Sequence, residues 1–130
     1  MQIYIVEDSA AVRTRLAALL STVPGASVSG GSAGASQATR EILERRPDMV
    51  ILDLDLAEGG GFDVLRALRT QVPEIDVYMR SNFSAYPYRQ LAERLGARGF
   101  FDKTQEFERL REVAADKARQ KELSCNPSCN

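Results

Sequence analysis

Short apolar runs alternate with stretches of helical periodicity along the whole chain. The apolar runs predict five strands, at residues 3–6, 26–30, 48–53, 75–80 and 98–101. After each strand, apolar residues recur every three or four positions, as in a helix with one buried face. Ser9 is the predicted N-cap of the first helix, and the last helix is expected to begin near Thr104. The pattern therefore predicts five βα units in succession.

The composition of individual elements indicates where they lie in such a fold. The apolar residues of the strand at 48–53, Met49 to Leu52, are consecutive, which is typical of a central strand covered by helices on both faces. Residues 26–30 hold few apolar side chains and fit an edge strand. The fourth helix is expected to end at Gly96 and to bury one apolar face, made of Tyr88, Leu91, Ala92 and Leu95.

A regular βα alternation with right-handed crossovers gives an α/β fold, a (βα)5 doubly wound parallel five-stranded sheet. The chain has 130 residues, enough for one domain with its own core. We expect this domain over residues 1–122 and a flexible C-terminal tail over 123–130. The tail holds Cys125 and Cys129, which without any histidine do not make a zinc site; reducible thiols are expected, with a redox or intermolecular role as the alternative.

Charge and composition exclude several classes of function. The formal net charge is −1 with acids and bases interleaved, so direct DNA binding is not expected. The apolar runs are strand-sized, so no membrane span is expected and a cytoplasmic location is predicted. The chain has no histidine, which excludes a Ser-His or Cys-His catalytic pair. Any histidine chemistry must come from a partner.

Polar side chains follow the strands at their C-terminal ends, which lie on one edge of a parallel sheet. Glu7 and Asp8 follow the first strand, Asp53 ends the third, Ser81 follows the fourth and Lys103 follows the fifth. Ligands bind at this edge in open α/β folds. Three carboxylates, a hydroxyl and a lysine suit a hard divalent cation beside a phosphoryl group.

The ordered set of these residues resembles the receiver domain of two-component response regulators. Eight positions separate Asp53 from Gly61, and twenty-two separate Ser81 from Lys103, as in that family. The resemblance covers roughly residues 1–122 and implies a flavodoxin-like strand order 2-1-3-4-5. It also implies a stand-alone, single-domain response regulator that is no enzyme beyond its own phosphorylation and dephosphorylation.

The resemblance assigns a role to each site residue. Asp53 would be the phosphoacceptor, attacking the phosphohistidine of a sensor histidine kinase or a histidine phosphotransfer protein. Mg²⁺ would be bound by Asp8, by Glu7 directly or through water, by Asp53 and by the backbone carbonyl of Asp55. Lys103 would pair with a phosphoryl oxygen.

The same resemblance implies a switch and an output surface. The Ser81 hydroxyl would move to the acyl phosphate, and Phe100 would turn inward into the space it leaves. The face formed by the fourth helix, the fifth strand and the fifth helix would then report the change to an unknown downstream protein. A monomer and a weak homodimer through that face both fit the sequence.

Several residues depart from the family pattern. Ala57 and Thr104 stand where prolines are common, and a trans bond is expected between Lys103 and Thr104. Arg80 occupies a strand position that is normally apolar, so it should reach solvent or pair with an acid. Asn82 and the Asp55 side chain are expected to alter the lifetime of the acyl phosphate.

Two alternatives stay open on the same residues. Asp53-Leu54-Asp55 also fits the Asp-x-Asp motif of haloacid-dehalogenase-like phosphatases, with Asp53 as nucleophile and Asp55 as general acid/base. In that family the Asp-x-Asp motif lies near the N-terminus and the paired acids come last, whereas here the acid pair Glu7-Asp8 precedes the motif. The second alternative is a pseudo-receiver that binds a partner without being phosphorylated.

Overall fold

The computed structural model describes the backbone of residues 1–56, 60–81, 86–103 and 106–124. Its five strands form one parallel sheet in the order β2-β1-β3-β4-β5. Their bounds are β1 (Gln2–Val6), β2 (Ser27–Ser32), β3 (Met49–Asp53), β4 (Asp76–Ser81) and β5 (Gly99–Asp102). The predicted fold class and strand order are therefore confirmed.

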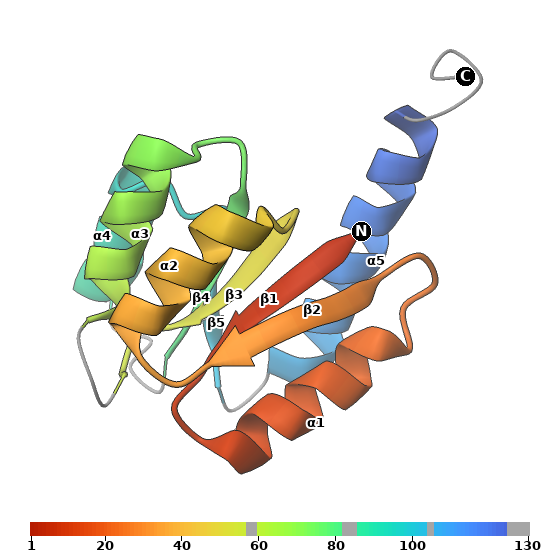
Figure 1. Cartoon of the computed structure of the whole chain (residues 1–130), viewed down its shortest axis with the longest axis horizontal. Coiled ribbons are helices and arrows are strands. Elements are labelled where there is room, and N and C mark those ends of the chain that lie inside the picture. The colour runs from red at the N-terminus through yellow and green to blue at the C-terminus, as the bar shows by residue number, and fades with distance from the viewer. Residues whose placement is uncertain (57–59, 82–85, 104–105, 125–130) are drawn as a thin grey trace.

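Five helices alternate with the strands and cover both faces of the sheet. They are α1 (Ala10–Ser21), α2 (Ala35–Arg45), α3 (Gly61–Gln71), α4 (Tyr86–Arg94) and α5 (Glu106–Ser124). Helices α1 and α5 lie on one face, and α2, α3 and α4 lie on the other (Figure 1). None of the helices in the described ranges is long and apolar enough to cross a membrane.

Strand β3 is central and β2 is an edge strand, as their compositions predict. All residues of β3 are buried, whereas in β2 only Ser32 is. β2 runs to Ser32, two residues past its predicted end, because β1 continues to pair with it beyond a register shift at Ile3/Tyr4. This extension brings the end of β2 to the first site residue, where the Glu7 amide donates to the Ser32 carbonyl at 3.0 Å.

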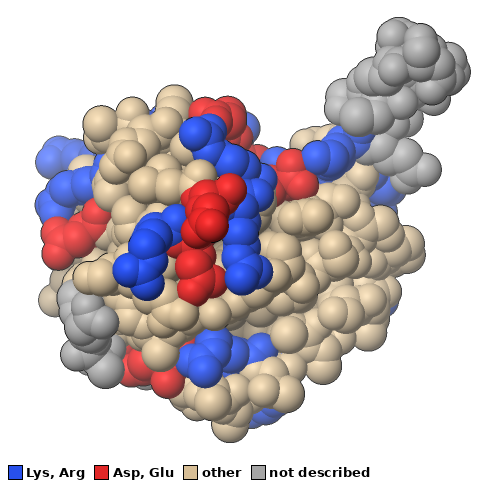
Figure 2. All heavy atoms as spheres, in the orientation of Figure 1, with Lys and Arg blue, Asp and Glu red and all other residues tan. Residues whose placement is uncertain are grey.

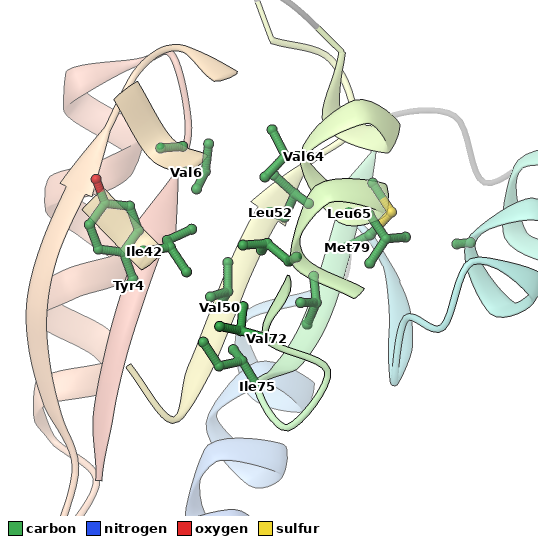
Figure 3. Close-up of a cluster of buried hydrophobic side chains, with 14 of the residues drawn as sticks. Tyr4, Val6, Ile42, Val50, Leu52, Val64, Leu65, Val72, Ile75 and Met79 are labelled. Carbon is green, nitrogen blue, oxygen red and sulfur yellow. The ribbon is translucent and has the colours of Figure 1, made fainter. Parts of the chain in front are cut away.

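Successive residues of each inner strand point to opposite faces, which gives two cores. Tyr4, Val6, Val50 and Leu52 pack against α2 and α3 in the core shown in Figure 3. On the other face, the alternate residues of β1 and β3 pack with Leu16 and Leu20 of α1 and with α5. Each fully buried aliphatic side chain contributes roughly 1.5–3 kcal/mol, so the alternation fixes which side chains face which helices.

Helix ends follow the sequence signals. The Ser9 hydroxyl accepts a hydrogen bond from the Val12 amide at 3.3 Å and caps α1. Gly96 follows α4 with a φ of +93°, a conformation that L side chains rarely adopt. One prediction in this region is wrong: Tyr88 of α4 is 44% exposed, while Ala92 is buried as expected. A tyrosine can keep part of its ring and its hydroxyl in water while the rest packs.

Some predicted features lie outside the described residues. The structure does not describe the backbones of Ala57, Asn82, Thr104, Cys125 and Cys129, or the side chain of Phe107. The predicted trans bond between Lys103 and Thr104 therefore also lies outside the described residues. The apolar stripe of α5 is confirmed at Leu110 and Ala114, which are fully buried. The boundary between domain and tail at residue 122 stays a prediction.

Charged side chains of both signs mix on the helical face over α2. Figure 2 shows Lys and Arg beside Asp and Glu there, and a largely uncharged surface over β2 and α1. Ion pairs such as Arg45–Glu41 account for this mixing. The face shown therefore displays no uniformly basic surface among the described residues.

Candidate functional site

The predicted site residues meet at the C-terminal edge of the sheet. Carboxylate oxygens of Glu7, Asp8 and Asp53 all lie within 4.8 Å of one another. Lys103 reaches the same place, with its Nζ 2.8 Å from Asp53 Oδ1 and 3.6 Å from Glu7 Oε1. The residues that the sequence placed on one edge are therefore in contact.

The alternation along the strands decides on which side of the sheet each group lies. Glu7, Asp53 and Lys103 each continue the face that packs against α1 and α5, because they keep the parity of Ile5, Ile51 and Phe101. Arg80 follows the same rule along β4 and joins them. Ser81 is one residue further along and belongs to the opposite face.

Asp53 is fully buried and is held on one side only. Its Oδ1 accepts hydrogen bonds from the Asp55 amide at 3.0 Å and from Lys103 Nζ at 2.8 Å. Within the described part of the chain, its Oδ2 has no hydrogen-bond partner. One carboxylate oxygen is thus fixed and the other is left to bind something else.

The electrostatic environment of Asp53 disfavours its charge. Burial raises the pKa of Asp53 to about 6, and the hydrogen bonds from Lys103 and the Asp55 amide offset only part of this effect. The carboxylate is still ionised at neutral pH. A further cation at Oδ2 would stabilise it.

Glu7 is also buried, but both of its carboxylate oxygens are hydrogen-bonded. Oε1 accepts from Arg80 Nη1 at 2.8 Å, and Oε2 accepts from the Ser9 amide at 2.8 Å. Burial alone would raise the pKa of Glu7, but hydrogen bonds with Asp8, the Ser9 amide and Arg80 lower it to about 2. Glu7 is therefore a carboxylate at every ordinary pH.

Arg80 pairs with an acid, which is one of the two outcomes that its sequence position predicts. The Arg80 and Glu7 side chains are only 2% and 3% exposed, so the pair is removed from water. The sequence could not identify this partner, because the two residues are 73 positions apart. The only sequence signal was a charge at a strand position that should be apolar.

Asp8 is the exposed member of the acidic group. A hydrogen bond with the Glu7 carboxylate raises the pKa of Asp8, with burial and the charge of Glu7 adding to the effect. Its oxygen lies toward solvent while the oxygens of Asp53 lie inside. Carboxylate oxygens suit a hard cation such as Mg²⁺, and Asp53 Oδ2 has no partner among the described residues. The residues present therefore fit the predicted metal.

Ser81 makes a contact that the sequence did not reveal. Its buried hydroxyl donates to Asp55 Oδ2 at 3.3 Å. The Asp55 amide is itself bonded to Asp53, so Asp55 lies between the predicted phosphoacceptor and the predicted switch residue. The Lys103 amide also bonds to the Ser81 carbonyl, at 3.0 Å, which ties β5 to this corner.

Gly61 is required for close packing. By sequence alone, the glycine run at 59–61 indicates loop flexibility, but this is wrong for Gly61, which begins α3. A Cβ there would lie 2.4 Å from the Asp53 carbonyl oxygen and 2.8 Å from Leu54 Cα. The start of α3 therefore presses against the backbone of the predicted phosphoacceptor, which explains the eight-residue spacing in physical terms.

Phe100, the predicted switch aromatic, is 8% exposed and belongs to the core on the α4 side. The Arg89 guanidinium lies 5.3 Å from the centre of its ring. Beside it is a cavity of about 240 Å³ between α4, β5 and α5, lined by Arg89, Ala92, Phe101 and Arg109 among others. The Phe100 ring thus already points inward in this structure.

Comparison with known proteins identifies the family. The response regulator receiver domain family matches residues 3–115. The protein-glutamate methylesterase/protein-glutamine glutaminase 6 of Anaeromyxobacter dehalogenans is 37% identical over 81 residues, which are 62% of this chain and 23% of that protein. The uncharacterized transcriptional regulatory protein YhcZ of Bacillus subtilis is 29% identical over 110 residues, 85% of this chain and 51% of that protein.

Solved structures agree with the fold. A CheY-like response regulator receiver domain protein from Methanospirillum hungatei superposes with a TM-score of 0.83 at 20% identity, covering 95% of this chain and 97% of that chain. The chain spans between 23% and 51% of the length of the two curated relatives described above, so their whole-protein activities are not carried over. The chain itself belongs to the response regulator receiver domains, the phosphoryl-accepting modules of two-component systems.

Proposed function

We propose that Asp53 is the phosphoacceptor of this receiver domain and that its Oδ2 is the attacking atom. The supporting observation is that Asp53 is fully buried and held through Oδ1, while Oδ2 has no partner among the described residues. A fixed carboxylate with one open oxygen is oriented for attack without losing further freedom in the transition state.

In the proposed reaction, Asp53 Oδ2 forms a bond to phosphorus as the N–P bond of a donor phosphohistidine breaks. The donor is a sensor histidine kinase or a histidine phosphotransfer protein, since this chain has no histidine. The electron pair of the broken bond stays on the histidine nitrogen. Lys103, already 2.8 Å from Asp53, is placed to balance the charge of the transferred group.

Mg²⁺ is the proposed cofactor. Asp8, Asp53 and the backbone carbonyl of Asp55 would hold it, with Glu7 beside them directly or through water. When bound, the ion supplies positive charge to the phosphoryl oxygens.

After phosphorylation, we propose that the Ser81 hydroxyl leaves Asp55 for a phosphoryl oxygen and that Phe100 secures the new arrangement. The α4-β5-α5 face next to the cavity would then change and bind an unidentified downstream protein. We also propose that the protein acts alone in the cytoplasm, as a monomer or as a weak homodimer through that face. We propose no direct binding to DNA or to a membrane.

The test is incubation with Mg²⁺ and acetyl phosphate followed by intact-mass measurement. We expect an added phosphoryl group on the wild type and on Asp63→Asn, an exposed carboxylate of α3 that serves as control. Asp53→Asn should show no addition. An adduct that persists in Asp53→Asn would overturn the assignment, and no adduct on the wild type would favour the pseudo-receiver.

The phosphatase alternative predicts a different result. It requires turnover of a phosphate ester rather than a lasting adduct, with Asp55 as general acid/base. The family match over residues 3–115 supports the receiver instead. The esterase named in the Anaeromyxobacter relative is not proposed here, because the alignment covers 23% of that protein.

A further inference from the structure

We infer that Arg80 sets the metal affinity of this site by holding Glu7 as its own counter-ion, so that Glu7 is not a direct metal ligand. The inference rests on the proposed function, because it concerns the Mg²⁺ that the proposed reaction uses. It assigns a role to Arg80, a residue outside the predicted site.

The first argument is that both oxygens of the Glu7 carboxylate already accept a hydrogen bond. Arg80 Nη1 lies 2.8 Å from Oε1, and the Ser9 amide lies 2.8 Å from Oε2. Lys103 Nζ adds a second cation 3.6 Å from Oε1. A metal ion at Glu7 would have to share Oε1 with the Arg80 guanidinium or Oε2 with the Ser9 amide.

The second argument is that neither partner can easily leave. Arg80 is 2% exposed and Glu7 is 3% exposed, so separating them would strand a charge away from water. The backbone of Glu7 is held as well, because Arg13 Nη1 donates to its carbonyl at 2.5 Å. The ion pair is therefore a fixed part of the apo site.

The third argument is charge. On the face shared with α1 and α5, Glu7 and Asp53 are balanced by Arg80 and Lys103, and Asp8 at the surface is the carboxylate left over. A divalent cation entering this site meets two fixed positive charges in a poorly screened environment. Asp8, Asp53 Oδ2 and the Asp55 carbonyl remain as donors, and binding is weakened.

The experiment measures Mg²⁺ affinity by calorimetry, without any phosphoryl donor, so its outcome is independent of the proposed function. Arg80→Met should bind Mg²⁺ at least about tenfold more tightly than the wild type. Arg98→Met removes the same formal charge from an exposed arginine that pairs with Asp76, and it should change the affinity less than twofold. Equal or weaker binding by Arg80→Met contradicts the inference.

Glu7→Gln shows whether the higher Mg²⁺ affinity of Arg80→Met requires the Glu7 carboxylate. In the wild-type background it leaves the Arg80 charge unbalanced, so it should weaken Mg²⁺ binding about as much as Arg80→Met strengthens it. In Arg80→Met it should remove the added affinity, because Glu7 has become available. A double variant that binds Mg²⁺ tenfold or more weakly than the wild type would show that Glu7 binds the metal despite Arg80, because removing both members of the pair leaves the net charge unchanged.

A measurement on the wild type covers the case in which Arg80→Met does not fold. The guanidinium protons of Arg80 and the carboxylate carbon of Glu7 are followed by NMR during a Mg²⁺ titration. We expect both signals to stay where they are at saturating Mg²⁺ while those of Asp8 and Asp53 move. Release of the Arg80 protons to solvent exchange overturns the inference.

Discussion

Buried charge at the sheet edge is the main feature at the scale of single residues. Asp53 and Glu7 are both carboxylates away from water, yet their pKa values move in opposite directions. The difference arises because hydrogen bonds to Glu7 occupy both oxygens, whereas Asp53 has one oxygen without a partner among the described residues. Asp53 is thus the carboxylate whose charge is poorly compensated in the apo protein.

Removing the charge of Asp53 should therefore stabilise the apo protein. Its pKa is raised to about 6, so ionisation costs stability as pH rises from about 4 to about 6. As pH rises through that interval, the free energy of unfolding of Asp53→Asn should increase by roughly 2–3 kcal/mol relative to that of the wild type. Urea unfolding at pH 4 and pH 8, in metal-free buffer, checks this. A difference that does not depend on pH would contradict it.

The lifetime of the acyl phosphate should depend on Asp55. Asp55→Asn removes a negative charge beside the phosphoryl group and weakens the hold on the Ser81 hydroxyl, 3.3 Å away. We expect phosphate loss to slow by about two- to tenfold, the effect of one modest hydrogen bond. Asn82→Ala should speed the loss by widening access. Phosphate release is timed after the donor is removed, and unchanged rates in both variants would rule the hypothesis out.

At the scale of elements, the contact between the end of β3 and the start of α3 holds the predicted phosphoacceptor in place. The Leu54 amide donates to the Arg80 carbonyl at 2.8 Å, and the Gly61 amide donates to the Leu54 carbonyl at 3.3 Å. The start of α3 is therefore hydrogen-bonded to the residue that follows β3.

Adding one methyl group at this contact should be costly. Gly61→Ala places a Cβ 2.4 Å from the Asp53 carbonyl oxygen, so the backbone of β3 or α3 must shift. We expect a loss of about 2 kcal/mol or more in thermal unfolding, and slower phosphorylation of Asp53. Gly60→Ala is the control, because among the described residues its Cβ would meet Asp63 at 3.4 Å and beyond, and it should cost less than about 1 kcal/mol. Equal losses would contradict the packing argument.

At the scale of the whole molecule, the opposite edge of the sheet holds the far part of α5. Asp76 at the start of β4 contacts Lys117 and, at 3.0 Å, Arg98. Asp48 before β3 accepts from Lys121 at 2.6 Å and from the Gln2 amide at 2.8 Å. Carboxylates at this edge therefore anchor a helix, whereas those at the other edge form the proposed reaction site.

The Asp76 anchor should give a pH dependence opposite to that of Asp53. Burial alone would raise the pKa of Asp76, but Lys117 and Arg98 lower it overall. Its stabilising effect is present above the unfolded pKa near 4 and is lost as pH falls through the lower folded value. Asp76→Asn should cost about 1–2 kcal/mol at pH 7 and progressively less toward pH 3, measured by thermal unfolding. Asp63→Asn should cost little at either pH.

The alternation of apolar runs was enough to predict the strands, their edge or centre position and the edge where the site residues meet, because burial leaves a local pattern. Partners distant in the sequence leave no such pattern. The Arg80–Glu7 pair, the Ser81–Asp55 contact and the close approach at Gly61 all depend on side chains or backbone meeting after the sheet is assembled. Tyr88 was misplaced because helical periodicity does not show how far a helix covers the sheet.

Helix α5 is attached to the sheet by different contacts along its length. It has 19 residues, about 28 Å of helix; Leu110 and Ala114 pack in the core, whereas the turns beyond them are tied to Asp76 and Asp48 by ion pairs. The helix begins at Glu106, three positions after Lys103, which contacts the predicted phosphoacceptor. Because these ion pairs hold the later turns, we expect a small movement at Lys103 to tilt α5 rather than slide it along its axis. A partner bound along α5 would meet a changed tilt.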